Sequence, residues 1–245
     1  MSLNNLSVRL SDAGRRAEGL AAIERAVAIY EQLAADNFAA YGPALALSLN
    51  NLSNRLSDAG RRAEGLAAIE RAVAIYEQLA ADNFAAYGPD LATSLNNLSV
   101  RLSDAGRRAE GLAAIERAVA IYEQLAADNF AAYGPDLAMS LNNLSNRLSD
   151  AGRRAEGLAA IERAVAIYEQ LAADNFAAYG PALASSLNNL SNRLGESAEP
   201  TAEQAKRLME IRAQLQLIKR RIRDEHIQVP AHLTWLLESE PDDKG

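Results

Sequence analysis

Asparagine is the residue type whose spacing in this sequence most clearly suggests chemistry. The pair Asn-Asn recurs within the segment Ser-Leu-Asn-Asn-Leu-Ser, and each copy starts 46 residues after the last, at Ser2, Ser48, Ser94, Ser140 and Ser186. A primary amide donates and accepts hydrogen bonds, so a row of amides can bind the main chain of an extended polypeptide without requiring one side-chain sequence. The alternative is that these asparagines connect neighbouring helices or face water.

Groups that could support catalysis or bind a metal are scarce. The chain has no Cys, and its 2 His, His226 and His232, flank Pro230 without a cluster of acids at ligand spacing. The glycines mark turns or helix contacts and form no phosphate-binding loop or dinucleotide fingerprint. We therefore expect no enzymatic activity, no cofactor and no metal site in this chain, although a parent protein could carry a catalytic domain elsewhere.

Composition limits the partners and the compartment. The 245 residues are 49% hydrophobic and 23% charged, and 25 Lys+Arg against 32 Asp+Glu give a net charge of −7. No overall field attracts nucleic acid or an anionic membrane. No stretch approaches the ~20 apolar residues of a membrane span, and the start lacks a secretory signal. The expected location is the cytoplasm, with no nucleic-acid or membrane partner.

The repeat predicts the domain organisation. Four complete units are followed by a fifth that departs from the pattern after Leu194. We expect a repeat domain at 1–194, C-terminal capping helices at 195–238 and a disordered tail at 239–245. The repeats are 2–47, 48–93, 94–139, 140–185 and a partial unit from 186.

Each unit contains signals for two helices. Around the start of the second repeat, Gly42-Pro43 and Gly60 predict a first helix, helix A, over 43–59, and helix B follows from about 62 to 81. Helix A carries one apolar stripe, whereas helix B carries two and must be covered from two directions. Stacked hairpins satisfy this requirement, so the expected fold is an all-α solenoid. Ser53, Gly65 and Ala72 are expected where the two helices approach closely.

These residues resemble a known signature. The run Asn51-Leu52-Ser53, then Gly60, Glu64-Gly65-Leu66 and Ala72, is similar to the tetratricopeptide repeat, whose usual period is ~34 residues. The longer unit resembles the extended variant of kinesin light chains and many bacterial multidomain proteins. The resemblance implies a right-handed superhelix of antiparallel hairpins that mediates protein–protein interaction, with peptides bound in a concave groove lined by helices A.

The polar face of helix A is accordingly the candidate ligand site. The repeats differ from one another mainly there, in the series Val8/Asn54/Val100/Asn146/Asn192, Leu47/Thr93/Met139/Ser185 and Ala44/Asp90/Asp136/Ala182. We interpret the first two series as pockets individualised for a ligand; drift after duplication and an engineered origin are the alternatives. The candidate peptide-binding residues are Asn50, Asn51, Asn54, Thr93, Asn96, Asn97, Val100, Met139, Asn142, Asn143, Asn146, Asn188, Asn189 and Asn192.

The C-terminal segment departs from the repeat. Thr201 is expected to cap an amphipathic helix over 202–225, which either covers the last helix A or forms a short coiled coil. The basic run 219–223 is interpreted as a solvated face, with nucleic-acid binding as the alternative. Residues 231–238 predict a short helix that joins the cap or occupies a groove.

A second function competes with peptide binding. The chain begins inside a helix A, so its first hairpin is expected to expose an apolar edge, as in a fragment or in a chain that stacks on another copy. The alternative to an interaction scaffold with an unidentified protein ligand is therefore a structural spacer or a homo-oligomer that associates through solenoid ends.

Overall fold

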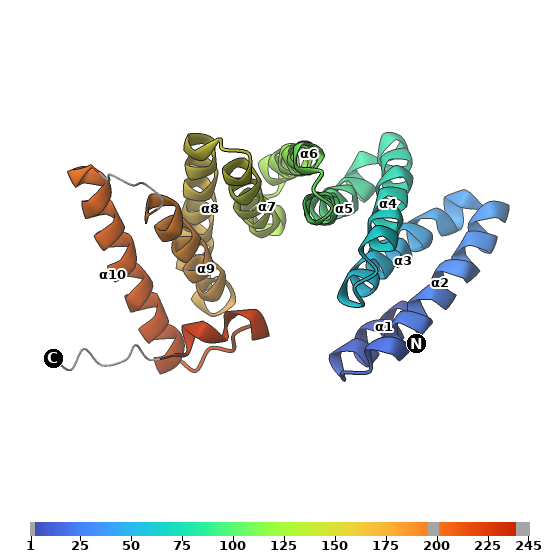
Figure 1. Cartoon of the computed structure of the whole chain (residues 1–245), viewed down its shortest axis with the longest axis horizontal. Helices are drawn as coiled ribbons and strands as arrows, with labels where there is room; N and C mark the ends of the chain where they lie inside the picture. The colour runs from blue at the N-terminus through green and yellow to red at the C-terminus, as the bar shows by residue number, and fades with distance from the viewer. Residues whose placement is uncertain (1–2, 196–200, 239–245) are drawn as a thin grey trace. The chain divides into compact units, whose positions relative to one another are not determined.

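A computed structural model of the chain describes residues 3–195 and 201–238 (Figure 1). Within these residues the chain forms α-helices that follow one another, with a final short 3-10 helix, η1. The elements are α1 Leu3–Asp12, α2 Arg16–Asp36, α3 Phe38–Asp58, α4 Arg62–Asp82, α5 Phe84–Asp104, α6 Arg108–Asp128, α7 Phe130–Asp150, α8 Arg154–Asp174, α9 Phe176–Gly195, α10 Ala202–Asp224 and η1 Ala231–Leu236. The predicted tail 239–245 and residues 196–200 lie outside the described residues.

The helices group into two compact units, Met1–Leu125 and Ala126–Gly245, which we describe separately. In the first unit, α1 packs on α2, α2 on α3, α3 on α4 and α4 on α5. In the second, α7 packs on α8, α8 on α9 and α9 on α10, and η1 also contacts α9. Consecutive helices therefore pack pairwise, and the predicted all-α architecture of helical hairpins is confirmed.

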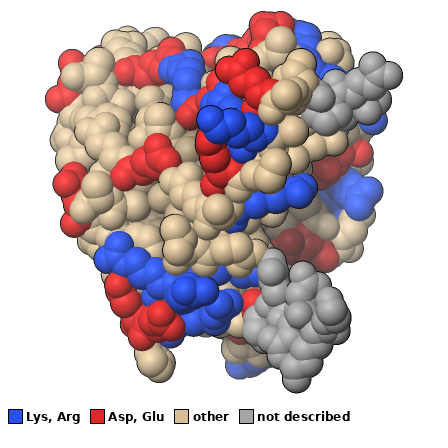
Figure 2. Space-filling view, turned by 90° about the vertical axis from the view of Figure 1, so that its left-hand side faces the viewer, with Lys and Arg blue, Asp and Glu red and all other residues tan. Residues whose placement is uncertain are grey.

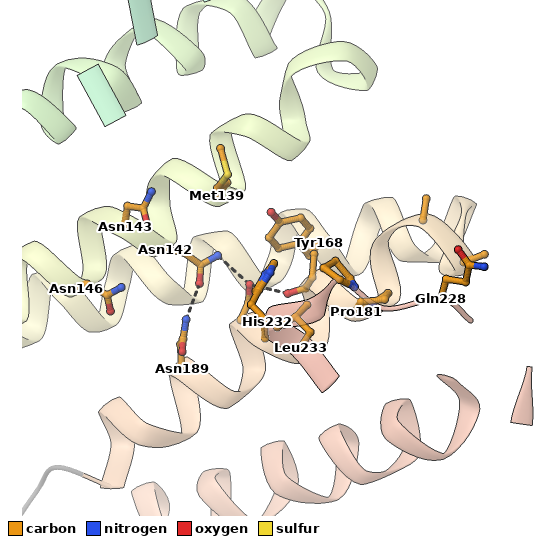
Figure 3. Close-up of a pocket in the computed structure, with 16 residues that line it drawn as sticks. Met139, Asn142, Asn143, Asn146, Tyr168, Pro181, Asn189, Gln228, His232 and Leu233 are labelled. Atoms are coloured by element: carbon orange, nitrogen blue, oxygen red, sulfur yellow. Dashed lines mark hydrogen bonds between the residues drawn. The ribbon is translucent and has the colours of Figure 1, made fainter. Parts of the chain in front are cut away.

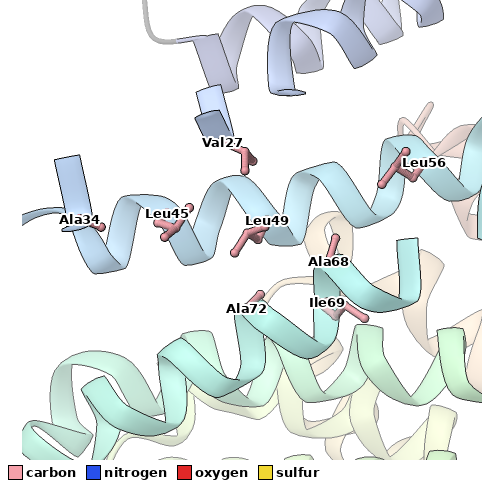
Figure 4. Packing of buried hydrophobic residues seen from close by; sticks show 8 residues of the cluster. All are labelled: Val27, Ala34, Leu45, Leu49, Leu56, Ala68, Ile69 and Ala72. Carbon is pink, nitrogen blue, oxygen red and sulfur yellow. The ribbon is translucent and has the colours of Figure 1, made fainter. Parts of the chain in front are cut away.

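The core of the first unit shows why a single repeat is not self-sufficient. Leu49 on α3 and Ile69 and Ala72 on α4 are fully buried, and Val27 and Ala34 reach the same cluster from α2 of the preceding hairpin (Figure 4). Helix α4 is covered by α3 on one side and by α5 on the other. This is the two-sided burial that the two apolar stripes of helix B predict.

The turns between helices A and B also agree with the sequence. Gly60 has φ +77°, a left-handed conformation that glycine adopts without steric cost. Its N–H donates to the Ser57 carbonyl at 3.0 Å, and the Arg61 N–H donates to the Leu56 carbonyl at 2.8 Å. The turn closes α3 and starts α4 at Arg62, as predicted.

The close approach predicted at the hairpin is confirmed by Gly65. A Cβ atom at this position would lie 3.0 Å from the Ser53 carbonyl oxygen and 2.8 Å from Ser57 Oγ. Any larger residue would push α4 away from α3. The glycine is therefore required by helix contact, although it lowers helix propensity by ~1 kcal/mol relative to Ala.

The predicted start of helix A at Pro43 is wrong. Helix α3 begins five residues earlier, at Phe38, and Asn37 caps it by accepting a hydrogen bond from the Ala40 N–H at 3.1 Å. Pro43 lies inside the helix, where the ring of Phe38 packs so closely on Gly42 that a Cβ there would lie 3.1 Å from it. Gly42 is thus a contact residue for an aromatic ring and not a turn residue.

The C-terminal helix covers the last helix A. Thr201 and Gln204 form a reciprocal capping box at the start of α10, and Ile211, Leu215, Ile218 and Ile222 are buried. Because α10 packs on α9, this apolar stripe is used within the chain and does not form the seam of a coiled coil.

Two details of the C-terminal segment differ from expectation. The predicted helix at 231–238 is a 3-10 helix that ends at Leu236. Lys219 lies 5.4 Å from the centroid of the Trp235 ring, and the Arg221 guanidinium lies 3.8 Å from that of Phe176. These cations contact aromatic rings, so the basic run is not simply a solvated face. On the face shown in Figure 2, basic and acidic side chains lie next to one another.

Candidate functional site

The first asparagine of each pair connects neighbouring repeats. Asn50 and Asn96 are only 8% and 5% exposed. The Asn50 amide donates to Ser94 Oγ at 3.2 Å, and the equivalent Asn142 donates to Ser186 Oγ at 2.9 Å. Each serine belongs to the next helix A along the chain. The first asparagine therefore has a structural role, and ligand contact by it remains a prediction.

The second asparagine donates to the first asparagine of the preceding repeat. Asn97 Nδ2 lies 2.8 Å from Asn50 Oδ1, and Asn189 Nδ2 lies 3.3 Å from Asn142 Oδ1. These second asparagines are half-buried and stand beside the buried bridge. The result is a repeated chain of hydrogen bonds, from the second asparagine to the first and from the first to a serine.

The variable positions of helix A have mixed surroundings. The side-chain oxygen Oδ1 of Asn54 accepts a hydrogen bond from Arg101 at 3.2 Å, and Oδ1 of Asn146 accepts one from Arg193 at 2.7 Å. Thr93 lies 2.8 Å from the Tyr122 hydroxyl. Leu47 and Met139, at the position equivalent to Thr93, are 47% and 43% exposed. Side chains of this series therefore reach solvent on helix A beside the asparagines.

A cavity of about 520 Å³ in the second unit brings several predicted residues together (Figure 3). Helix α7 contributes Met139, Asn142, Asn143 and Asn146, and α9 contributes Asn189 with Ser185. Tyr168 comes from α8, and Gln228, Pro230, His232 and Leu233 come from the C-terminal segment. The cavity thus lies on the asparagine-bearing side of two successive helices A.

The other candidate residues do not line this cavity. Asn188 is half-buried and Asn192 is exposed on α9. The remaining ones belong to the first unit, and they are Asn50, Asn51, Asn54, Thr93, Asn96, Asn97 and Val100.

Sequence reasoning missed part of the lining. Tyr168 lies in an apolar stripe of helix B and is buried, as that stripe predicts, and His232 is exposed, as expected for a solvated histidine. Neither was named as a residue of this cavity. Burial and the nearby carboxylate of Asp136 raise the pKa of Tyr168 to about 12, so its hydroxyl is neutral and donates to the Pro135 carbonyl at 3.3 Å. The signal available in the sequence was a tyrosine that recurs at this place in each helix B. In the second unit its hydroxyl reaches Pro135 in the first part of α7.

Comparison with known proteins identifies the family. A family described as tetratricopeptide repeat matches residues 1–38, 45–84, 91–130 and 137–176. The chain belongs to the tetratricopeptide repeat family. Proteins with tetratricopeptide repeats generally mediate protein–protein interaction or act as non-catalytic scaffolds. No curated protein sequence matches the chain.

Solved structures share the tetratricopeptide repeat fold at low sequence identity. A putative kinesin light chain from Podosopora anserina, described as having nearly identical TPR-like repeats, is 21% identical with a TM-score of 0.67 and covers 89% of this chain and 93% of its own. BtubC from P. vanneervenii is 17% identical, with a TM-score of 0.50 over 86% of this chain and 92% of its own. MamA is 11% identical, with a TM-score of 0.55 over 88% and 96%.

The described part of the chain shows neither a metal site nor a membrane span. Over residues 3–195 and 201–238, no group of three or more His, Cys, Asp or Glu is placed to hold a metal ion. None of the helices in that part of the chain is long and apolar enough to cross a membrane.

Proposed function

We propose that this tetratricopeptide repeat chain is a non-catalytic scaffold that binds an extended segment of a partner protein along the asparagine-bearing face of helices A. The observation that carries the proposal is the cavity where Met139, Asn142, Asn143, Asn146 and Asn189 meet. A concave site with a few polar groups on a largely apolar lining is the usual form of a ligand pocket.

The two asparagines of each pair have different roles in this proposal. The first is buried in the first unit and half-buried in the second, and it holds neighbouring repeats together, as Asn50 does with Ser94. The second is half-buried, and an amide offers two N–H donors and an acceptor oxygen. The one bond from Asn97 to Asn50 does not use this whole capacity. The second asparagines are therefore the ones that bind the main chain of a ligand.

Selectivity comes from the variable series beside the asparagines. Leu47 and Met139 expose apolar surface, whereas Thr93 and Ser185 present hydroxyl groups at the equivalent positions. A ligand on the first unit would therefore meet Leu47 and Thr93, and one on the second unit would meet Met139 and Ser185. Main-chain bonds supply affinity that does not depend on sequence, and this series selects among partners.

Selection from a random peptide display library tests the proposal. We would compare the wild-type chain with a variant in which Asn51, Asn97 and Asn143 are changed to Ala. A matched control changes three exposed amides on helices B to Ala, namely Gln78, Gln124 and Gln170. Circular dichroism must first show that all three proteins are equally helical.

We expect peptides to be enriched on the wild-type chain and on the glutamine control but lost on the asparagine variant. Peptides that bind all three proteins equally, or no enrichment at all, would contradict the proposal. The spacer or self-assembly alternative would then be tested by dilution, since association through solenoid ends gives a concentration-dependent mass.

A further inference from the structure

We infer that the cavity between α7, α9 and the C-terminal segment is an anchor subsite for an uncharged stretch of polypeptide that carries an aliphatic side chain. The inference rests on the proposed function, because the subsite belongs to the same asparagine-bearing face. It adds the chemistry of the segment that the site takes and the place where a bound segment is held.

One wall of the cavity is formed by residues that lie outside the repeats. Helices α7, α8 and α9 supply most of its lining, and Gln228, Pro230, His232 and Leu233 of the C-terminal segment border it (Figure 3). This wall is fixed by buried Leu233 and Leu236 and by the contact of Trp235 with Lys219. A hydrogen bond from Arg223 Nη1 to the Glu238 carbonyl, 3.2 Å long, holds the end of the same segment. The cavity is therefore formed before any ligand enters.

The lining of the cavity consists of neutral polar and apolar side chains together with one histidine, His232. Among the described residues that line it there is no Lys, Arg, Asp or Glu. Position 182 is Ala, where the two preceding repeats have Asp90 and Asp136. Burial raises the pKa of Asp136, which shows that a carboxylate at this position is partly desolvated. A charged side chain entering the cavity would lose water, and the lining itself offers no Lys, Arg, Asp or Glu to pair with it, so an uncharged segment is favoured.

The distribution of polar and apolar groups in the lining favours a segment that carries an aliphatic side chain. Met139, Tyr168, Pro181 and Leu233 offer apolar surface, and Ala182 leaves room between them. The amides of Asn143, Asn146 and Asn189 lie around this surface (Figure 3). An aliphatic side chain fits among the apolar groups while its own main chain reaches the amides. A volume of about 520 Å³ lies within the ~300–1,000 Å³ of typical ligand pockets.

Such an anchor solves a problem that the repeats create. Because the repeats are nearly identical, a bound segment could shift by one repeat with little change in energy. A subsite that depends on residues 228–233 occurs once per chain, since that segment lies outside the repeat pattern. The anchor therefore fixes the register of the bound segment.

Methyl NMR on methionine tests the inference directly. The chain has 3 Met, and Met139 lines the cavity whereas Met209 is 67% exposed on α10. The probes are three capped tripeptides, acetyl-Ser-Leu-Ser-amide and its analogues with Asp or Lys in place of Leu. We expect the Leu probe to shift the Met139 methyl signal saturably, the Asp and Lys probes to bind at least tenfold more weakly, and the Met209 signal to stay unchanged.

A pair of substitutions supplies the matched control. Ala182→Asp places in the cavity the side chain that the fold already accepts at Asp90 and Asp136, and Ala44→Asp makes the same change in the first unit. We expect Ala182→Asp to abolish the Met139 response and Ala44→Asp to leave it intact. Equal responses of Met139 and Met209, equal binding of the three probes, no response, or no effect of Ala182→Asp would overturn the inference. In the selection experiment, no enrichment on the wild-type chain, or equal binding to the asparagine variant, would instead overturn groove binding as a whole.

Discussion

The Nδ2 atom of Asn97 lies 2.8 Å from the Oδ1 atom of Asn50, so an asparagine of one helix A donates to an asparagine of the helix A before it. Asn50 in turn donates to Ser94, which lies three residues before Asn97 in the same helix, α5. Both polar groups of the buried amide are thereby satisfied. The asparagines that mark the repeat in the sequence thus stabilise the stacking of repeats as well as bordering the candidate site.

Replacing Asn50 by Ala should destabilise the chain. Asn50 is buried, and its loss leaves the Asn97 and Ser94 side chains without their bonds to it, which costs about 1–3 kcal/mol for buried groups. Asn51→Ala is the matched control, because Asn51 is half-buried and makes a longer bond of 3.4 Å to Asn4. Urea unfolding measures both variants. Equal losses of stability in the two would contradict a structural role specific to the first asparagine.

Gly111→Ala should destabilise the chain, although replacing glycine by alanine inside a helix usually stabilises it. A Cβ at Gly111 would lie 2.9 Å from the Ser99 carbonyl oxygen and 2.7 Å from Ser103 Oγ. Overpacking of this kind costs ~1–3 kcal/mol. Gly195→Ala is the control, because nothing lies within 4 Å of a Cβ there, and it should be neutral or stabilising. Thermal melting compares the two; a gain in stability for Gly111→Ala would show that the helices can separate without cost.

Asp136→Ala should change the pH dependence of stability. Burial raises the pKa of Asp136, so the folded state disfavours the ionised carboxylate. The contribution of Asp136 to the free energy of unfolding is therefore most favourable below the unfolded pKa of ~3.9, where the carboxyl group is protonated. It decreases as the pH rises through the higher pKa of the folded state. We expect the variant to be more stable than the wild type at pH 7 and the difference to vanish near pH 3. Thermal melting of both proteins at the two pH values measures this difference. A variant whose stability relative to wild type is lower at pH 7 than at pH 3 would refute the prediction.

Leu236→Ala should release the wall of the cavity while leaving the repeats folded. Leu236 is fully buried, and truncating a buried leucine typically costs ~2–5 kcal/mol. Because η1 lies after the last helix of the chain, this loss should fall mainly on the C-terminal segment. Hydrogen exchange should become faster in residues 227–238 and stay unchanged in α3 and α4. Faster exchange in those two helices would instead mean that the segment supports the whole chain.

Much of the fold follows from local patterns in the sequence. The two stripes of helix B, Gly60 at the turn and Thr201 at the start of α10 are local signals, and each has the predicted structural role. The start of helix A was missed because Gly42-Pro43 is a strong signal for a helix beginning. Asn37 was a competing cap signal three residues before Ala40, and the packing of Phe38 on Gly42 that favours it depends on three-dimensional contact.

The candidate site could be predicted only in part. Its asparagines and Met139 are visible as a repeated face of helix A and a variable position beside it. The burial of Asn50 could not be predicted, because the helical pattern of one repeat does not reveal how near the next helix A lies. The sequence predicts that residues 231–238 join the cap, and η1 does contact α9. It does not predict that His232 and Leu233 border this cavity, which depends on the path of the chain after a turn at His226 with φ +53°.

The central claim is that a partner segment binds along the asparagine face, and side-chain amide NMR with an enriched peptide tests it most directly. One sample carries ¹⁵N only in asparagine side chains and the other only in glutamine side chains. The account predicts that the peptide shifts asparagine signals, while the glutamine signals of helices B, from Gln78, Gln124 and Gln170, stay unchanged. Shifts confined to those glutamines, with the asparagine signals unmoved, would contradict it.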